Sequence, residues 1–420
     1  MSYFLFVAYL LLCCWVLCKI KFIVNAGLSK KIIVILFITK VFAGVFAGWL
    51  YHTHPDADTW LYHKDALKEY YLLFTHPKEY FTNLFVSNYK DTYGGFFRSS
   101  NSYWNDLKDN FIIKLISIFD IFSFGNYYIN VIIYNFLIFF GNIALFKVFS
   151  AAYKSRSLLL VVLCFLLPSF LFFSSTIHKD GLIMAAIGII LYIINALLSG
   201  DKWSAKKIIA LFFAVLLTFM LRNFVIIALL PAITAWIISK KTKFHPLYIY
   251  SGIYFCCIIL FFLVPKIIPV IDLPQAVVNK QESFFELERA RSFIETDTLH
   301  PTLNSFVTIA PQSLNHSFLR PYITDGKKMT FLYPLAFELI IYEIILLIFI
   351  FFRKKNKNND SSFILFGLFF TVSLLLITGY ITPVLGALVR YRSIYLPFLI
   401  APLLMNINYK KISTVLSIKK

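Results

Sequence analysis

The fold of this chain is constrained most by its long apolar runs, which short groups of Lys and Arg separate at regular intervals. Hydrophobic residues make up 59% of the chain and the mean hydropathy is +0.75, whereas soluble domains are roughly half apolar. A helix needs about 20 apolar residues to cross a bilayer. Runs of that order lie at 3–18, 32–50, 126–146, 158–174, 181–198, 208–221, 224–238, 247–264, 330–352, 361–379 and 393–407. The sequence therefore predicts an all-α polytopic membrane protein with about 11 transmembrane helices.

The distribution of charge predicts how these runs are oriented. The loops on one side hold 21 Lys and Arg but only two acids, Asp201 and Asp360, and this surplus equals the formal net charge of +19. Cytoplasmic loops are enriched in Lys and Arg, so we expect the N-terminus outside the cell membrane and the C-terminus in the cytoplasm. We expect the protein to lie in the inner (cytoplasmic) membrane. Because a nucleic-acid-binding protein would gather its cations on one face, we expect no nucleic-acid partner.

Two long segments on the outer side, 52–125 and 265–329, are too long to be simple connectors of one membrane domain that spans residues 1–420. Long loops in compact proteins usually carry function. In the first segment we expect a helix at 65–74, and the polar residues Asn110, Lys114, Ser117 and Asp120 predict a helix lying in the membrane interface. In the second segment we expect an amphipathic helix near 282–295.

The sharpest local signal in the sequence is an acidic pair, Asp56 and Asp58, directly after a predicted helix reaches the outer side. A carboxylate held near the bilayer surface can act as a general base toward a hydroxyl. Trp60, Tyr62 and His63 follow, and their rings are suited to line a sugar-binding cavity. The alternative is a hydrated start of a loop, because two acids at this spacing are common.

A second signal is a short outer turn that carries His178, Lys179 and Asp180. Together these side chains can bind an anionic group while the acid orients a cation. Asp180 has an alternative role as an acid that stabilises the N-terminus of the following helix.

Further cations and an acid are predicted at the outer ends of helices or inside the membrane. Arg222 occupies a two-residue turn, Arg320 precedes a proline, and Arg390 and Arg392 lie at the mouth of the last predicted helix. Guanidinium groups clamp phosphates in two-point geometry, although snorkelling arginines at helix ends are common. Glu338 is placed to line the floor of an outer cavity, and Lys40 and Glu343 lie at similar depth and predict an ion pair.

Four of these stretches resemble the C-type membrane glycosyltransferases, the superfamily that includes the protein O-mannosyltransferases and the aminoarabinose transferase. They are the acidic pair after an early helix, the interface helix that closes its loop, the turn Ser-Ser-x-x-His-Lys-Asp, and the Arg-Tyr-Arg before Leu-Pro. In that superfamily an outer carboxylate is the base and the donor is a sugar on a polyprenyl phosphate. Here two predicted helices, not one, precede the acidic pair.

The resemblance implies transfer of a sugar from a polyprenyl-phosphate donor to an extracytoplasmic glycan, lipid or protein acceptor. Asp56 or Asp58 would be the base, and the lipid phosphate would bind among Lys179, Arg222, Arg320, Arg390 and Arg392. No cofactor is required by these residues, although the acidic pair would be able to hold a divalent cation. Three alternatives remain: a polymerase or ligase of lipid-linked O-antigen or exopolysaccharide repeats, a transporter or flippase of lipid-linked glycans, and a purely structural assembly subunit.

Overall fold

The structure is a computed structural model that describes residues 2–54, 57–86, 103–155, 157–286, 289–327, 329–354 and 359–417. Within these ranges it is helical, without strands. Eight of the described helices are long and apolar enough to cross a membrane, and a ninth span results if the pair 158–166 and 168–175, bent by 45°, is counted as one. The prediction of a polytopic all-α membrane protein is thus confirmed at this level.

All eleven predicted apolar runs coincide with helices. Two of these helices are comparatively short, α1 (Ser2–Leu17) with 16 residues and α11 (Ala205–Leu221) with 17, and the run 158–174 is divided among three shorter helices. Contacts divide the chain into two compact units, one made of residues 1–148 and 170–223 and the other of residues 149–169 and 224–420. The total of about eleven crossings remains a prediction.

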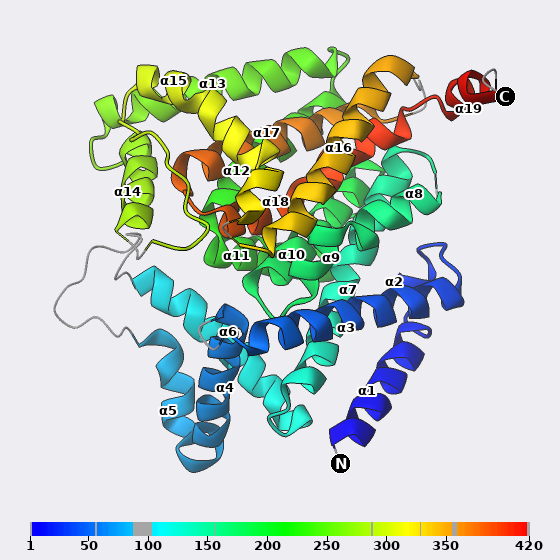
Figure 1. Ribbon diagram of the computed structural model, residues 1–420, viewed down its shortest axis with the longest axis vertical. Coiled ribbons are helices and arrows are strands. Elements are labelled where there is room, and N and C mark those ends of the chain that lie inside the picture. Colours follow the sequence, from blue (N-terminus) through cyan, green and yellow to red (C-terminus); the bar gives the residue numbers. More distant parts are fainter. Residues whose placement is uncertain are drawn as a thin grey trace. The chain divides into compact units, whose positions relative to one another are not determined.

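The first unit contains the helices of the N-terminal half. They are α1 (Ser2–Leu17), α2 (Lys21–Val24), α3 (Lys30–His52), α4 (Asp58–Thr75), α5 (Pro77–Thr82), η1 (Asn83–Phe85), α6 (Tyr103–Ser123), most of α7 (Tyr127–Ala152) and α9 (Pro168–Ser175), α10 (Lys179–Leu198) and α11 (Ala205–Leu221). Side chains cap several of these helices: Ser29 accepts from the backbone N–H of Ile32 at the start of α3. In this unit α4 packs along α6, and α10 along α11 (Figure 1).

The second unit contains the remaining helices. They are α8 (Leu158–Val161), the π-helix η2 (Val162–Leu166), α12 (Asn223–Lys241), α13 (Pro246–Ile267), α14 (Leu273–Phe285), α15 (Leu303–Leu314), the π-helix η3 (Asn315–Leu319), η4 (Ile323–Lys327), α16 (Leu332–Phe352), α17 (Ser361–Ile381), α18 (Leu385–Met405) and α19 (Tyr409–Ser417). Its core is rich in rings, with Phe149, Phe363 and Phe398 in contact. The segment 286–302 between α14 and α15 is irregular where it is described.

Two predicted helices need correction. The helix expected near 282–295 lies earlier, at 273–285, because Asp272 caps its N-terminus and Pro274 fits its first turn. Residues 289–299 instead form an extended connection, in which the N–H of Ile294 donates to the carbonyl of Pro383. The last apolar helix begins at Leu385, not at residue 393, so that Arg390 and Arg392 lie within it.

The polar stripe on α6 also differs from the expectation for an interface helix. Lys114, Ser117 and Asp120 are buried inside the first unit, where they bond to Glu69, Tyr80 and Asn130 respectively. The exposed face near the end of α6 is apolar instead, with Ile118 and Phe122. The stripe therefore marks the side of the helix that packs on the protein.

Candidate functional site

The carboxylate of Asp58 lies at the start of α4 and faces the turn that precedes α10. Its Oδ2 lies 2.9 Å from Nε2 of His178, within hydrogen-bond distance. The Asp58 side chain remains 47% exposed, whereas that of His178 is only 7% exposed. The second oxygen of a carboxylate accepts hydrogen bonds as well as the first, so Asp58 combines a fixed orientation with access to solvent. Asp56, the other member of the acidic pair, lies outside the described residues.

His178 connects Asp58 to a buried ion pair. Its Nδ1 lies 2.7 Å from Oδ2 of Asp180, and Oδ1 of Asp180 lies 2.5 Å from Nη2 of Arg222. Asp180 is 1% exposed and stands in the first turn of α10, where the helix dipole favours an anion. Arg222 is the residue between α11 and α12 and is itself buried. The result is a continuous row of charged and polar groups, Asp58–His178–Asp180–Arg222, that runs from an exposed end to a buried end.

The turn that carries His178 is held by side chains from α3 and α7. Tyr134 donates its hydroxyl hydrogen bond to the carbonyl of His178. Asn135 donates through Nδ2 to the carbonyl of Ser175 at 2.8 Å. Lys40 donates from Nζ to the hydroxyls of Ser174 and Ser175, at 2.8 and 3.2 Å. These bonds lie within the buried part of the unit, so the backbone at His178 is fixed before any ligand arrives.

The partners of Lys40 differ from the expected ones. The sequence suggested an ion pair with Glu343, but Lys40 bonds to two serine hydroxyls, and Glu343 is exposed on α16. A lysine with 1% exposure is costly to bury unless its ammonium group donates hydrogen bonds. Holding the 174–178 turn in place is therefore the role that its contacts support.

Lys179 lies next to this row and pairs with a carboxylate that the sequence did not single out. Its Nζ contacts Oδ1 of Asp109, on α6, and Tyr62 donates from its hydroxyl to the same oxygen at 3.1 Å. The ammonium group also lies 5.4 Å from the centre of the Tyr62 ring. Asp109 is 40% exposed. Lys179 and Tyr62 thus stand beside Asp58 and His178, as the sequence grouped them.

Trp60 and His63 occupy structural positions and not an open cavity. Trp60 donates from Nε1 to the carbonyl of Gly48 at 2.9 Å and stacks on Tyr127 with ring centres 4.2 Å apart. His63 is buried against both rings. Burial lowers the pKa of His63 from 6.5 to about 4, because the charged imidazolium loses its hydration. The two side chains anchor α4 on α3 and α7.

The other predicted residues belong to the second unit. Arg392 donates from Nη1 to the carbonyls of Ser317, Phe318 and Arg320, at 3.1, 3.0 and 2.8 Å. Arg392 thus satisfies carbonyls at the end of η3, which gives it a structural role. Arg390 lies one turn from the start of α18, with its guanidinium 5.6 Å from the centre of the Tyr391 ring.

Two further residues of the second unit have carboxylate or backbone partners. Arg320 lies with Nε 4.0 Å from Oδ2 of Asp325 and packs over Tyr322. Glu338 is buried, and its Oε1 accepts from the backbone N–H and the hydroxyl of Ser169 and from the hydroxyl of Tyr342. Ser169 stands in the first turn of α9, so Glu338 caps that helix in the manner of an N-terminal acid. Glu338 therefore has a structural role, whereas the sequence suggested the floor of a cavity.

Two contacts at the site were not found from the sequence. Asp109 is one of several acids in a long segment, and only the packing of α6 on α4 places it beside Lys179. Tyr134 is one aromatic residue among many in α7, and its hydrogen bond to the His178 carbonyl depends on the packing within this unit. The sequence around Asp109 and Tyr134 contains no motif that would have indicated a place at the candidate site.

No group of three or more His, Cys, Asp or Glu side chains is arranged to hold a metal ion within the described ranges. The suggested divalent-cation site at Asp56 and Asp58 includes a residue outside those ranges. The six cysteines are free thiols. Comparison of the chain with protein-family models, with curated proteins and with solved structures found no match.

Proposed function

We propose that this protein is a membrane glycosyltransferase that moves a sugar from a polyprenyl-phosphate donor to an extracytoplasmic glycan, lipid or protein acceptor. One observation carries the proposal: the exposed carboxylate of Asp58 is oriented by His178. The other ring nitrogen of His178 contacts Asp180, which forms a buried ion pair with Arg222. A general base needs this combination of access and fixed orientation. The apolar helices support a bilayer as the environment of the donor lipid.

In the proposed reaction Asp58 accepts the proton of the acceptor hydroxyl. The acceptor oxygen forms a bond to the anomeric carbon of the sugar, while the bond from that carbon to the phosphate oxygen breaks and its electrons leave with the lipid phosphate. His178 contacts Oδ2 of Asp58 and so orients the carboxylate, whose side chain is 47% exposed and accessible to the acceptor. Lys179 follows His178 in the chain, and its ammonium group stabilises the charge that develops on the departing phosphate. Asp180 and Arg222 orient His178 from behind.

The ion pair between Lys179 and Asp109 is suited to a site in which the lysine exchanges its carboxylate partner for a phosphate. The donor phosphate is a diester with one negative charge, as a carboxylate has, and it gains a second charge when the bond to the sugar breaks, so a cation beside it favours the departing group. Asp109 is 40% exposed and can turn toward water, whereas Lys179 is 11% exposed and fixed at the N-terminus of α10. We therefore expect the donor phosphate to replace Asp109 as the partner of Lys179.

The test is release of free polyprenyl phosphate by the purified, full-length protein in lipid nanodiscs. The substrates are a panel of polyprenyl-phosphate sugars with an acceptor glycan, with and without a chelator. Asp58→Asn should reduce release by at least about 100-fold, which is the lower range for loss of a general base. Asp65→Asn is the matched control, because Asp65 lies on the same helix, is exposed and pairs with Lys68. Asp56→Asn, assayed beside them, shows whether the neighbouring acid shares the role.

Full activity in Asp58→Asn would contradict the proposed base. Loss of activity with the chelator alone would indicate a divalent cation at the acidic pair. The role of the lysine is tested with Lys179→Met. This variant should raise the KM for the donor and lower kcat together, because the lysine contacts the phosphate both before and after the bond breaks.

A polymerase or ligase of lipid-linked repeats is the second candidate, because Arg222 belongs to the same row of side chains as Asp58. Enzymes of that kind would use the arginine directly, and Arg222→Lys would then abolish the reaction while Asp58→Asn retained part of it. The products also differ. A polymerase makes a ladder of lengths on one lipid, whereas the proposed transferase adds a single unit.

A further inference from the structure

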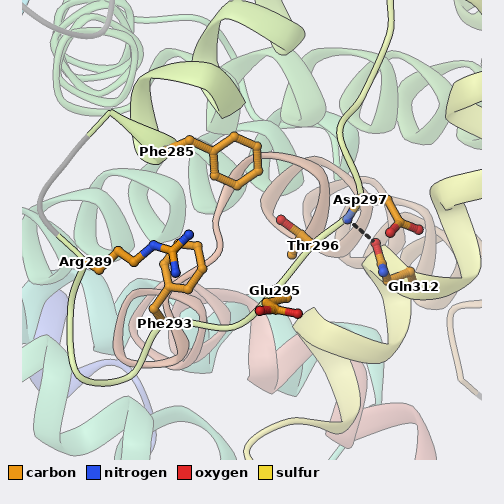
Figure 2. A pocket seen from close by; sticks show the side chains of 7 residues that line it. All are labelled: Phe285, Arg289, Phe293, Glu295, Thr296, Asp297 and Gln312. Carbon is orange, nitrogen blue, oxygen red and sulfur yellow. Dashed lines mark hydrogen bonds between the residues drawn. The ribbon is translucent and has the colours of Figure 1, made fainter.

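The second unit contains a cavity of about 520 Å³ beside the irregular segment that follows α14. It is lined by Phe285, Arg289, Phe293, Glu295, Thr296, Asp297 and Gln312 (Figure 2). Figure 2 shows Arg289 and Phe293 on one side and Asp297 and Gln312 on the other, with Thr296 and Glu295 between them. Its volume falls within the range of about 300 to 1,000 Å³ that is typical of small-ligand sites.

The backbone that forms the cavity is fixed by buried hydrogen bonds. Gln281, which is 1% exposed, donates to the carbonyls of Asp297 and Tyr380 and accepts from the N–H of Leu299. Ser292 and Ile294 bond to the chain between α17 and α18. The irregular backbone from 292 to 299 is thus held on both sides, so this part of the cavity wall is in place before a ligand binds.

The side chains around the cavity offer both kinds of contact that a saccharide makes. Phe285 and Phe293 supply flat apolar surfaces for the C–H faces of sugar rings. Glu295 and Asp297 accept hydrogen bonds from hydroxyls, and Arg289 donates them. The Arg289 guanidinium is already placed 5.0 Å from the centre of the Phe293 ring.

One polar side chain at the cavity, the amide of Gln312, is suited to a ligand rich in hydroxyls. Gln312 accepts from the N–H of Asp297 through Oε1 at 3.1 Å, which fixes the orientation of its amide. The NH₂ group of the same amide is then the one that can donate a hydrogen bond to a ligand hydroxyl.

We propose that this cavity is a saccharide-binding site that accepts neutral or amino sugars and rejects acidic ones. Two carboxylates face one guanidinium, so the lining has a net charge of −1 and repels a uronic acid or a sugar phosphate. A purely apolar ligand is disfavoured, because it would displace water from both carboxylates without replacing its hydrogen bonds. The site lies wholly within the second unit and goes beyond the transfer chemistry proposed for Asp58.

The test is calorimetric titration of the full-length protein in lipid nanodiscs, free of maltoside and glucoside detergents, whose sugar headgroups would compete. Three trisaccharides of equal length serve as probes: maltotriose, the glucosamine trisaccharide and trigalacturonic acid. We expect binding of one or both of the first two, and affinity for the acid at least about tenfold weaker. Because the readout is binding and not transfer, the result does not depend on the role of Asp58.

Glu295→Gln and Asp297→Asn should each weaken binding by about tenfold or more, since each removes a hydrogen bond to a charged acceptor. Glu282→Gln is the matched control, because Glu282 is exposed on α14 and does not line the cavity. Three results would overturn the proposal: no binding of either non-acidic probe, preference for the acidic probe, or equal affinity in the wild type and both cavity variants.

Discussion

At the scale of single residues, burial and partners separate an exposed carboxylate, which we propose to react, from a buried carboxylate that holds the fold. Asp58 is half exposed, whereas Asp180, two residues from His178, is almost fully buried and paired with Arg222. A buried carboxylate keeps its charge only when a cation or hydrogen-bond donors are close. The two aspartates therefore have different roles, which their sequence spacing does not distinguish.

His63 gives a residue-scale prediction about pH. Its pKa in the folded protein is about 4, below the usual 6.5, so the unfolded chain binds this proton more tightly. Stability is then fully present above pH 6.5 and is lost as the pH falls toward 4, by up to about 3 kcal/mol. We expect His63→Gln to show a shallower decline of melting temperature between pH 6.5 and 4 than the wild type.

The matched control is His76→Gln, because His76 is exposed at the end of α4. It should keep the steeper decline of the wild type. Parallel melting curves for the wild type and His63→Gln across this pH range would show that the imidazole is not the group responsible.

At the scale of elements, the close approach of α7 and α10 depends on residues without side chains. A Cβ at Gly141 would lie 2.2 Å from the Cα of Ala185, and a Cβ at Gly188 would lie 2.4 Å from the carbonyl oxygen of Gly141. Small residues let helices in membranes pack with their backbones in contact. α10 carries His178 at its N-terminus, so this packing also positions the candidate site.

Gly141→Ala should therefore lower the melting temperature by several degrees, since overpacking costs about 1–3 kcal/mol. Gly252→Ala, in α13, is the control: its added Cβ meets nothing within 4 Å, and alanine favours a helix. Equal melting temperatures for Gly141→Ala and Gly252→Ala would rule out the tight packing of α7 on α10.

Several elements follow from local sequence and others do not. The apolar runs give the long helices, and the Ser and Asp caps set starts such as that of α17 at Ser361. The sequence did not show that the polar stripe of α6 packs on protein, because periodicity shows that a helix has two faces but not which face is buried. In a membrane the buried face can be the polar one.

At the scale of the whole molecule, the charge imbalance predicts orientation. If the basic loops face the cytoplasm, green fluorescent protein fused after Lys420 should fluoresce, and alkaline phosphatase fused there should be inactive. A thiol introduced at Tyr3 should react with an impermeant maleimide on intact cells. Phosphatase activity at the C-terminus would contradict the predicted topology.

The sequence by itself determined the class of this protein, because hydrophobic length and the placement of Lys and Arg act through the bilayer, residue by residue and without knowledge of neighbours. It also located Asp58, His178, Lys179, Asp180 and Arg222 as unusual groups. Only the tertiary structure decided that these five share one unit with Asp109, that Glu338 and Arg392 satisfy backbone groups, and that Phe285 and Glu295 surround one cavity. Contacts between residues distant in sequence depend on helix packing, which local spacing does not encode.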